Sequence, residues 1–271
     1  MEIKFVTYKS ELIDLFNGLG LTQGDDVMVH SSMRSLGYLV NGALDVVDAL
    51  GECVDLDKGT ILMPAHSGQL TDPAEWKNPT IPKESLMMVR NSMKLFDKKV
   101  TPIRGRGVIS EAFLSYPEVK RSDHPLNSIS ALGKRADLYT RSHNFDEPEG
   151  IDSPIGKLYE NNGAILGLGV SVDRFTAIHL AEYIADVEYL YKNNPVVLFE
   201  NKDGINYFRR IEKYPGDSSN FVKILPILRD INILKEVQFK KGIVTYFKVR
   251  PVIDCIVKLL NENPYFLVEN N

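Results

Sequence analysis

His179 and Glu182 are the two residues of this 271-residue chain whose types and spacing best suit proton transfer. The apolar spacing of residues 175–186 predicts a helix, with Thr176 available as its N-cap. On a helix the two side chains are roughly 60° apart around the axis and about 4.5 Å apart along it, so both can face one cleft. A carboxylate beside an imidazole favours the charged ring, so the pair could act as a general base. The spacing alone fits better with a histidine of the surface or core beside a solvated glutamate.

Two arginine-containing segments have the composition of anion sites. His30-Ser-Ser-Met-Arg34 follows a predicted buried strand, where open sheets place their ligands, and it offers hydroxyls, turn amides and a guanidinium. Arg104-Gly-Arg-Gly107 precedes a predicted helix, so backbone N–H groups and arginines could bind phosphate there. The first segment could equally be a polar loop that caps the next helix. The second matches neither the dinucleotide-binding nor the Walker spacing.

A histidine-based site is a further alternative. Ser122-Asp-His-Pro125 could hold an Asp/His pair, although its proline and aspartate are more typical of a turn. His30, His66 and His124 could ligate a metal ion together with aspartates, but they lack a recognised spacing such as His-Glu-x-x-His. We therefore expect no metal, and we keep a metal-dependent hydrolase as an alternative.

The elements that must position these residues indicate an α/β protein. Strand-like segments at 26–32 and 59–65 flank a helical segment at 43–54, which predicts a mixed sheet flanked by helices and parallel at least in this part. We expect one domain over residues 1–271, with a possible subdomain from about residue 195. Further segments predict helices at 8–21, 108–114 and 251–260, strands at 163–170 and 242–249, and a hairpin at 195–211.

Composition restricts the classes of function. A content of 44% apolar and 25% charged residues is typical of a globular protein and excludes disordered and fibrous classes. The net charge of −4 does not favour nucleic-acid binding but suits a small cationic substrate. Two cysteines, no signal-like start and no long apolar run indicate a cytoplasmic protein without membrane contact.

Six motifs taken in order resemble the aminoglycoside 3-N-acetyltransferase family. Each motif is weak by itself, but six in register are specific, and the resemblance covers roughly residues 12–190. This resemblance implies an N-acetyltransferase with its own α/β fold that uses acetyl-coenzyme A as co-substrate. The motifs are His30-Ser-Ser-Met-Arg-Ser-Leu-Gly37, Gly59-Thr-Ile-Leu-Met-Pro-Ala65, Asp72-Pro-Ala-Glu-Trp76, Arg121-Ser-Asp-His-Pro125, Ser153-Pro-Ile-Gly156 and His179-Leu-Ala-Glu182.

The resemblance also implies roles for individual residues. His179 and Glu182 match the catalytic histidine and glutamate of the family. The implied coenzyme-binding residues are Ser31, Ser32, Met33, Arg34, Arg104, Gly105, Arg106 and His124. The triplet at 104–106 departs from the arginine-methionine-glycine of the resistance enzymes, so the coenzyme contact there can differ. Backbone N–H groups near Ser31 and Ser32 are the expected donors to the thioester oxyanion.

The predicted reaction is acetylation of an amino group of an aminoglycoside or related amino sugar, with His179 as general base. We place this small-molecule amine between two acidic, turn-rich loops, where Asp72, Glu75, Trp76 and Asp152 would contact it. One alternative is an acetylase of amino sugars in surface polysaccharide or natural-product biosynthesis, and another is a non-catalytic carbohydrate-binding protein. A homodimer is compatible with the sequence.

Overall fold

The computed structural model describes residues 5–192 and 194–268, and a seven-stranded mixed sheet organises this part of the chain. The strand order is β10-β11-β7-β2-β4-β6-β5, in which β7, β2 and β4 run parallel and the other neighbours are antiparallel. The strands are β2 (Asp26–Ser31), β4 (Thr60–Pro64), β5 (Lys120–Arg121), β6 (Ile129–Gly133), β7 (Ala164–Leu168), β10 (Lys235–Phe239) and β11 (Gly242–Lys248).

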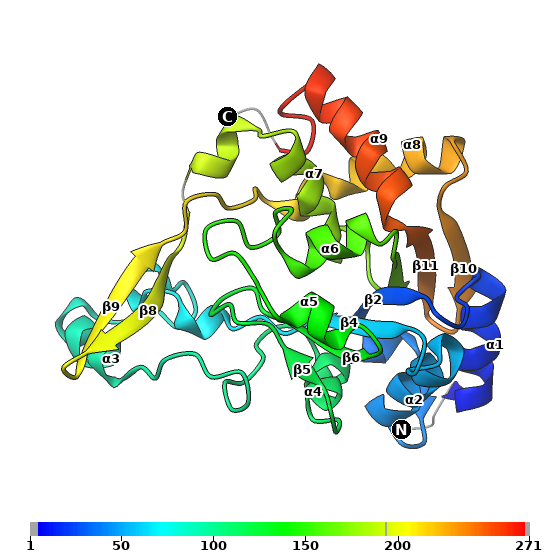
Figure 1. Ribbon diagram of the computed structural model, residues 1–271, viewed down its shortest axis with the longest axis horizontal. Coiled ribbons are helices and arrows are strands. Elements are labelled where there is room, and N and C mark those ends of the chain that lie inside the picture. The colour runs from blue at the N-terminus through cyan, green and yellow to red at the C-terminus, as the bar shows by residue number, and fades with distance from the viewer. Residues whose placement is uncertain (1–4, 193, 269–271) are drawn as a thin grey trace.

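Helices cover both faces of the sheet because its central strands are apolar on both sides. Within β2, Val27 and Val29 pack into one hydrophobic cluster and Met28 into the other, as the two-residue period of a strand requires. The two sets of helices lie on opposite sides of the strands in Figure 1. The Val27 side carries α1 (Lys9–Leu19), α2 (Ala43–Val54) and α4 (Val108–Leu114), and the Met28 side carries α5 (Ala136–Thr140), α6 (Pro154–Glu160), α7 (His179–Ile184), α8 (Ile224–Asp230) and α9 (Val249–Glu262).

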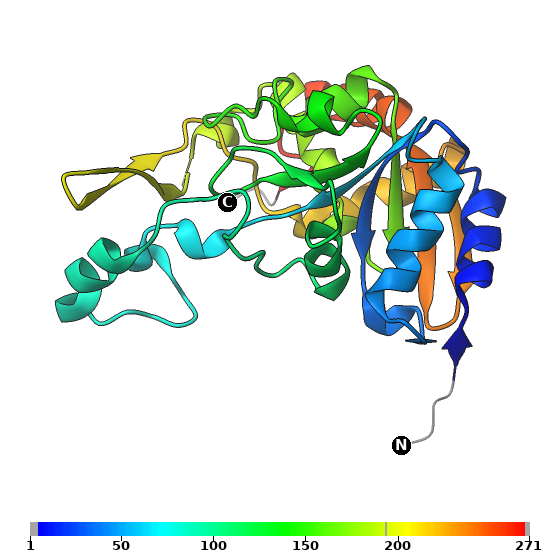
Figure 2. The same ribbon diagram turned by 60° about the horizontal axis from the view of Figure 1, so that its bottom comes forward.

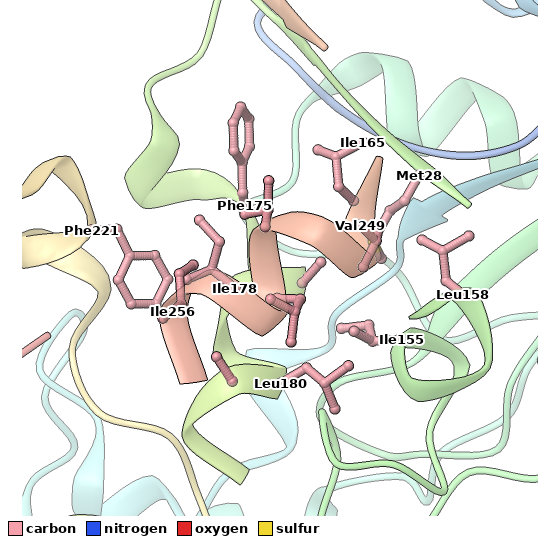
Figure 3. Packing of buried hydrophobic residues seen from close by; sticks show 14 of the residues in the cluster. Met28, Ile155, Leu158, Ile165, Phe175, Ile178, Leu180, Phe221, Val249 and Ile256 are labelled. Carbon is pink, nitrogen blue, oxygen red and sulfur yellow. The ribbon is translucent and has the colours of Figure 1, made fainter. Parts of the chain in front are cut away.

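The hydrophobic cluster on the Met28 side holds the segment that directly precedes α7. Figure 3 shows Ile178, Phe221 and Ile256 gathered beside α9, and all three are fully buried. Ile178 directly precedes α7, so this packing fixes where the first turn of that helix begins.

A projecting arm lies outside the body formed by the sheet and the helices on its two faces. It consists of the hairpin β8 (Val196–Lys202) and β9 (Ile205–Arg210) and of residues 67–101, which include α3 (Leu86–Ser92); we call it the hairpin arm. Figures 1 and 2 both show it extending away from the sheet. Its strands are joined by a two-residue turn, Asp203-Gly204, with φ of 53° and 81°, a backbone that this residue pair adopts readily.

Most of the expected elements are confirmed. Helices α2 and α4 have the predicted bounds, β2 and β4 are parallel neighbours, and the hairpin lies where its turn predicts it. The predicted mixed sheet flanked by helices is also confirmed. The subdomain from about residue 195 stays a prediction, and β10 and β11 from that part of the chain complete one edge of the main sheet.

The helix predicted over residues 175–186 is wrong in its details. A 3₁₀ turn (Thr176–Ile178) comes first and α7 starts only at His179, so Thr176 makes no capping hydrogen bond. The sequence also gave no signal for β6 and β10. Cys53 is buried and Cys255 half-buried, and both are free thiols. Over residues 5–192 and 194–268, the helices are too short or too polar to cross a membrane.

Candidate active site

A cleft of about 920 Å³ opens at the carboxyl ends of the parallel strands. Since β7, β2 and β4 are neighbours that run the same way, the segments that follow them meet at one edge of the sheet. We call this the strand-end cleft. Among the predicted coenzyme residues, its lining includes Ser31, Ser32, Met33, Arg34, Gly105 and Arg106. Their contact with a coenzyme stays a prediction.

Gly169 shapes the side of the cleft that follows β7. Its φ is +64°, and a Cβ there would lie 2.1 Å from the Cβ of Ser35, so both the backbone and the space require glycine. The hydroxyl of Ser35 donates to the Gly169 carbonyl over 2.9 Å. This close approach fixes the path of the chain toward Asp173 and Arg174, which also line the cleft.

A second, smaller cavity of about 200 Å³ adjoins the strand-end cleft. The two share Arg106, Asp173 and Arg174 in their linings, so ligands in them can meet at this point. We call it the histidine cavity. Its other lining residues include His66, Asn127, Glu149, Thr176, His179 and Tyr214.

The predicted pair, His179 and Glu182, is hydrogen-bonded in this cavity. Nδ1 of His179 lies 2.5 Å from Oε2 of Glu182, and Oε1 of the same carboxylate accepts from the hydroxyl of Tyr189 over 2.8 Å. Glu182 is fully buried, and the ring of Phe221 lies 4.8 Å from the His179 ring, centroid to centroid. A carboxylate accepts only, so Nδ1 carries the proton and Nε2 of neutral His179 is left with the lone pair.

Glu182 also makes His179 a stronger base. Burial disfavours the charged imidazole, but the charge and hydrogen bond of Glu182, with a smaller contribution from Glu149, outweigh it and raise the pKa of His179 above its usual value. The geometry therefore provides an oriented imidazole that can accept a proton at Nε2.

Glu149 is a site residue that sequence reasoning missed. It lies in the second of the acidic, turn-rich loops, residues 144–154, whose composition predicts a surface loop, but Glu149 is only 2% exposed and accepts a hydrogen bond from the amide of Asn127. Burial raises the pKa of Glu149 to about 7. An acidic run has no periodicity that separates one carboxylate from its neighbours, and Asn127 is distant in sequence, so no local pattern distinguishes Glu149.

His30 and His66 are buried at the ends of β2 and β4. Burial, with Arg106 as a second cause, lowers the pKa of His30 to about 3 and that of His66 well below its usual value. Both rings are therefore neutral. In the described ranges, histidine, cysteine and carboxylate side chains form no group of three or more placed to hold a metal ion.

His124 and Arg104 lie apart from the other predicted coenzyme residues. Nδ1 of His124 accepts from the backbone N–H groups of Leu126 and Asn127 over 3.1 and 2.9 Å, so the histidine, and not only the expected Asp123 and Pro125, holds this turn. Arg104 is exposed, and its backbone N–H donates to the His66 carbonyl. Neither residue belongs to the lining of the strand-end cleft as the described chain forms it.

The predicted substrate residues have contacts of their own. Asp72 accepts two hydrogen bonds from Arg90, and the indole N–H of Trp76 donates to Thr71. Glu75 accepts from the backbone N–H of Val196, and Asp152 is exposed. Contact of these residues with a substrate stays a prediction.

One of the expected oxyanion donors, the backbone N–H of Ser32, already has a partner, while the other N–H groups near Ser31 stay a prediction. The backbone N–H of Ser32 already donates to the Leu168 carbonyl over 2.9 Å, because β2 and β7 pair up to this residue. This N–H group is therefore not available to a thioester oxygen.

Comparison with known proteins gives one family. The family model of aminoglycoside 3-N-acetyltransferases matches residues 28–261. A relative in Bacillus subtilis (strain 168), the SPbeta prophage-derived aminoglycoside N(3')-acetyltransferase-like protein YokD, is 38% identical over 77% of this chain and 76% of its own. Aminoglycoside N(3)-acetyltransferase III of Pseudomonas aeruginosa is 30% identical over 79% of each chain.

Solved structures agree with this family. The crystal structure of YokD superposes with a TM-score of 0.88 at 33% identity, covering 97% of this chain and 96% of that one. A mutant of aminoglycoside acetyltransferase AAC(3)-IVa in complex with apramycin superposes with a TM-score of 0.81 at 26% identity, covering 98% and 96%. The chain therefore belongs to the aminoglycoside 3-N-acetyltransferase family, and it is an acyltransferase whose co-substrate is acetyl-coenzyme A.

Proposed function

We propose that this enzyme acetylates an amino group of an aminoglycoside or related amino sugar, with His179 as general base and Glu182 as its partner. The observation that carries the proposal is the buried 2.5 Å contact between His179 and Glu182 in a cavity that adjoins the strand-end cleft. The names of the relatives and the apramycin complex of AAC(3)-IVa support this class of acceptor.

The strand-end cleft and the histidine cavity suit the two substrates, the coenzyme and the amine. The strand-end cleft is several times larger than the histidine cavity and has Arg34 and Arg106 in its lining, which suits a coenzyme that carries phosphates. The histidine cavity holds the base. An amine in this cavity and a thioester in the cleft would face each other at Arg106, which lines both.

The transfer is a direct attack. The amine nitrogen bonds to the thioester carbonyl carbon, the C–S bond breaks, and Nε2 of His179 takes a proton from the nitrogen. Glu182 stabilises the imidazolium, and this proton then passes to the leaving thiolate, which gives the coenzyme A thiol. Glu182 is fully buried, so its charge acts on the imidazolium with little screening by water.

The test measures thiol release from acetyl-coenzyme A in the presence of apramycin, gentamicin or glucosamine, with water alone as background. We expect at least one amine to give release above background, together with an acetylated product seen by mass spectrometry. If none of a broad panel of aminoglycosides and amino sugars does so, the acceptor class is wrong.

A further inference from the structure

The histidine cavity concentrates buried polar atoms that lack a partner. Four residues of its lining each carry one such atom in the described part of the chain: Nε2 of His66, Nε of Arg106, Oδ1 of Asn127 and Oε2 of Glu149. Buried polar atoms are normally hydrogen-bonded, because an unmade bond costs the group its hydration. Their gathering in one small cavity indicates a ligand that is itself polar.

Glu149 has the chemistry to receive a cation there. Its Oε1 accepts from the Asn127 amide, which leaves the buried Oε2 and Oδ1 of Asn127 as two unused acceptors in the same cavity. An ammonium group offers three N–H donors and one positive charge. The primary ammonium of the acceptor therefore complements this corner of the cavity.

An acceptor that arrives as an ammonium has one more proton to lose than His179 takes. A sugar amine is largely an ammonium near neutral pH, and acetylation to a neutral amide removes two protons from its nitrogen. His179 accounts for one of them. We infer that Glu149 receives the acceptor's ammonium and takes its first proton, so that His179 is free to take the second; this inference rests on the proposed function.

The protons balance in this scheme. The ammonium gives one proton to the Glu149 carboxylate, and the neutral amine attacks the carbonyl carbon. Nε2 of His179 takes the second proton and passes it to the thiolate as the C–S bond breaks. Glu149 then returns its proton to solvent, so one proton is released for each acetyl group transferred.

The surroundings tune Glu149 for this exchange. Burial raises its pKa to about 7, while His179, Asn127 and Arg106 favour the ionised form. A carboxyl group in this range can hold an ammonium and also accept a proton from it. The charged and titratable groups that face it are His179, Glu182 and Tyr183 from α7, Arg106 from the loop before α4, and Tyr214.

The deciding experiment follows kcat/KM for apramycin against pH in the wild type, Glu149→Gln and Glu147→Gln. Glu147 is the matched control, because it lies in the same loop but pairs with Lys213. We expect E149Q to lose about 10–100-fold at pH 7, with the KM for acetyl-coenzyme A unchanged. This loss should shrink as the pH approaches the amine's own pKa, where the amine arrives already neutral. An equal loss at every pH, or none, would overturn the inference.

Failure of the proposed function can be told apart from failure of this inference. If the wild type acetylates no amine, apramycin binding is measured by calorimetry at pH 7 in buffers of different ionisation enthalpy. A half-protonated Glu149 that ionises on binding the ammonium should release about half a proton, and E149Q should release none. No binding, or identical proton release in both proteins, would contradict a role for Glu149.

Discussion

Asp72 in the hairpin arm and Glu149 in the histidine cavity are both acidic loop residues, but of the two only Asp72 forms a direct ion pair with an arginine in the described chain. The guanidinium of Arg90 donates to both carboxylate oxygens of Asp72, at 2.9 and 2.7 Å. Glu149 instead has a buried oxygen without a partner among the described residues. The comparison teaches that the acceptor atoms of an acidic motif can all be used for hydrogen bonds within the fold. A buried carboxylate oxygen without a hydrogen-bond partner is the better candidate for chemistry.

The largest expected effect comes from removing His179, the proposed general base in the histidine cavity. His179→Ala should lower kcat by about 10²–10⁴-fold, the usual contribution of a positioned general base. Coenzyme affinity should stay nearly unchanged, because His179 lines the histidine cavity and not the strand-end cleft. Thiol-release kinetics and calorimetry with coenzyme A check the two parts. Wild-type turnover in H179A, on an amine that the wild type acetylates, would remove His179 from the mechanism.

Replacing Glu182, the partner of His179, should lower activity less than replacing His179 and should also shift the pH dependence of activity. Glu182→Gln keeps the shape but loses the charge, and we expect kcat to fall about 10–100-fold. Neutral His179 is the active form, so activity rises with pH through its pKa. The amide no longer raises that pKa, so the rising limb should move to lower pH in E182Q. A profile of kcat/KM against pH that coincides with the wild type would show that the pair is not coupled.

Arg106, which lines both the strand-end cleft and the histidine cavity, should contribute to coenzyme affinity. If Arg106 binds a coenzyme phosphate as predicted, Arg106→Ala removes one charge-assisted contact, which costs about 1.5–3 kcal/mol, or roughly 10–150-fold in Kd. Calorimetry with coenzyme A measures this change. Arg141→Ala is the control, because Arg141 is exposed and lies outside the cleft lining. Equal affinity in the wild type and R106A would place the phosphates elsewhere.

The smallest effect on activity is expected from replacing Asp72 in the hairpin arm. It would sharpen the contrast between Asp72 and the Glu149 of the histidine cavity. Asp72→Asn weakens the ion pair with Arg90, which should cost about 0.5–1 kcal/mol and lower Tm by about 1–4 °C. We expect kcat/KM to stay within about twofold, because such partly exposed pairs contribute little beyond local stability. Scanning calorimetry and steady-state kinetics measure both quantities. A tenfold loss of kcat/KM at unchanged Tm would instead support the predicted contact of Asp72 with the substrate.

Sequence reasoning succeeded where one local pattern determines the structure. The period of α2, the buried runs of β2 and β4, and the spacing of His179 and Glu182 are each contained within a few residues. It failed where distant segments decide the outcome. The burial of Glu149 depends on Asn127, and the start of α7 depends on packing against α9.

The same limit explains the substrate residues. Asp72 and Trp76 have the composition of a carbohydrate site, but no local pattern reveals that Arg90 and Thr71 already use their polar groups. The resemblance of motifs implies a coenzyme contact for His124, which stays a prediction. What no local pattern reveals is that Nδ1 of His124 accepts from Leu126 and Asn127 and so holds the turn that precedes the Asn127 of the cavity lining.

The most direct test of the account titrates His179 itself by NMR on protein with labelled histidines. The chain has five histidines. Burial lowers the pKa of His30 to about 3, that of His124 to about 4, and those of His66 and His143 well below the usual value. His179 should therefore be the only histidine that titrates above the usual value of 6.5, and its pKa should fall in E182Q. A pKa of His179 below 6.5 in the wild type, or one that E182Q leaves unchanged, would contradict the coupled pair.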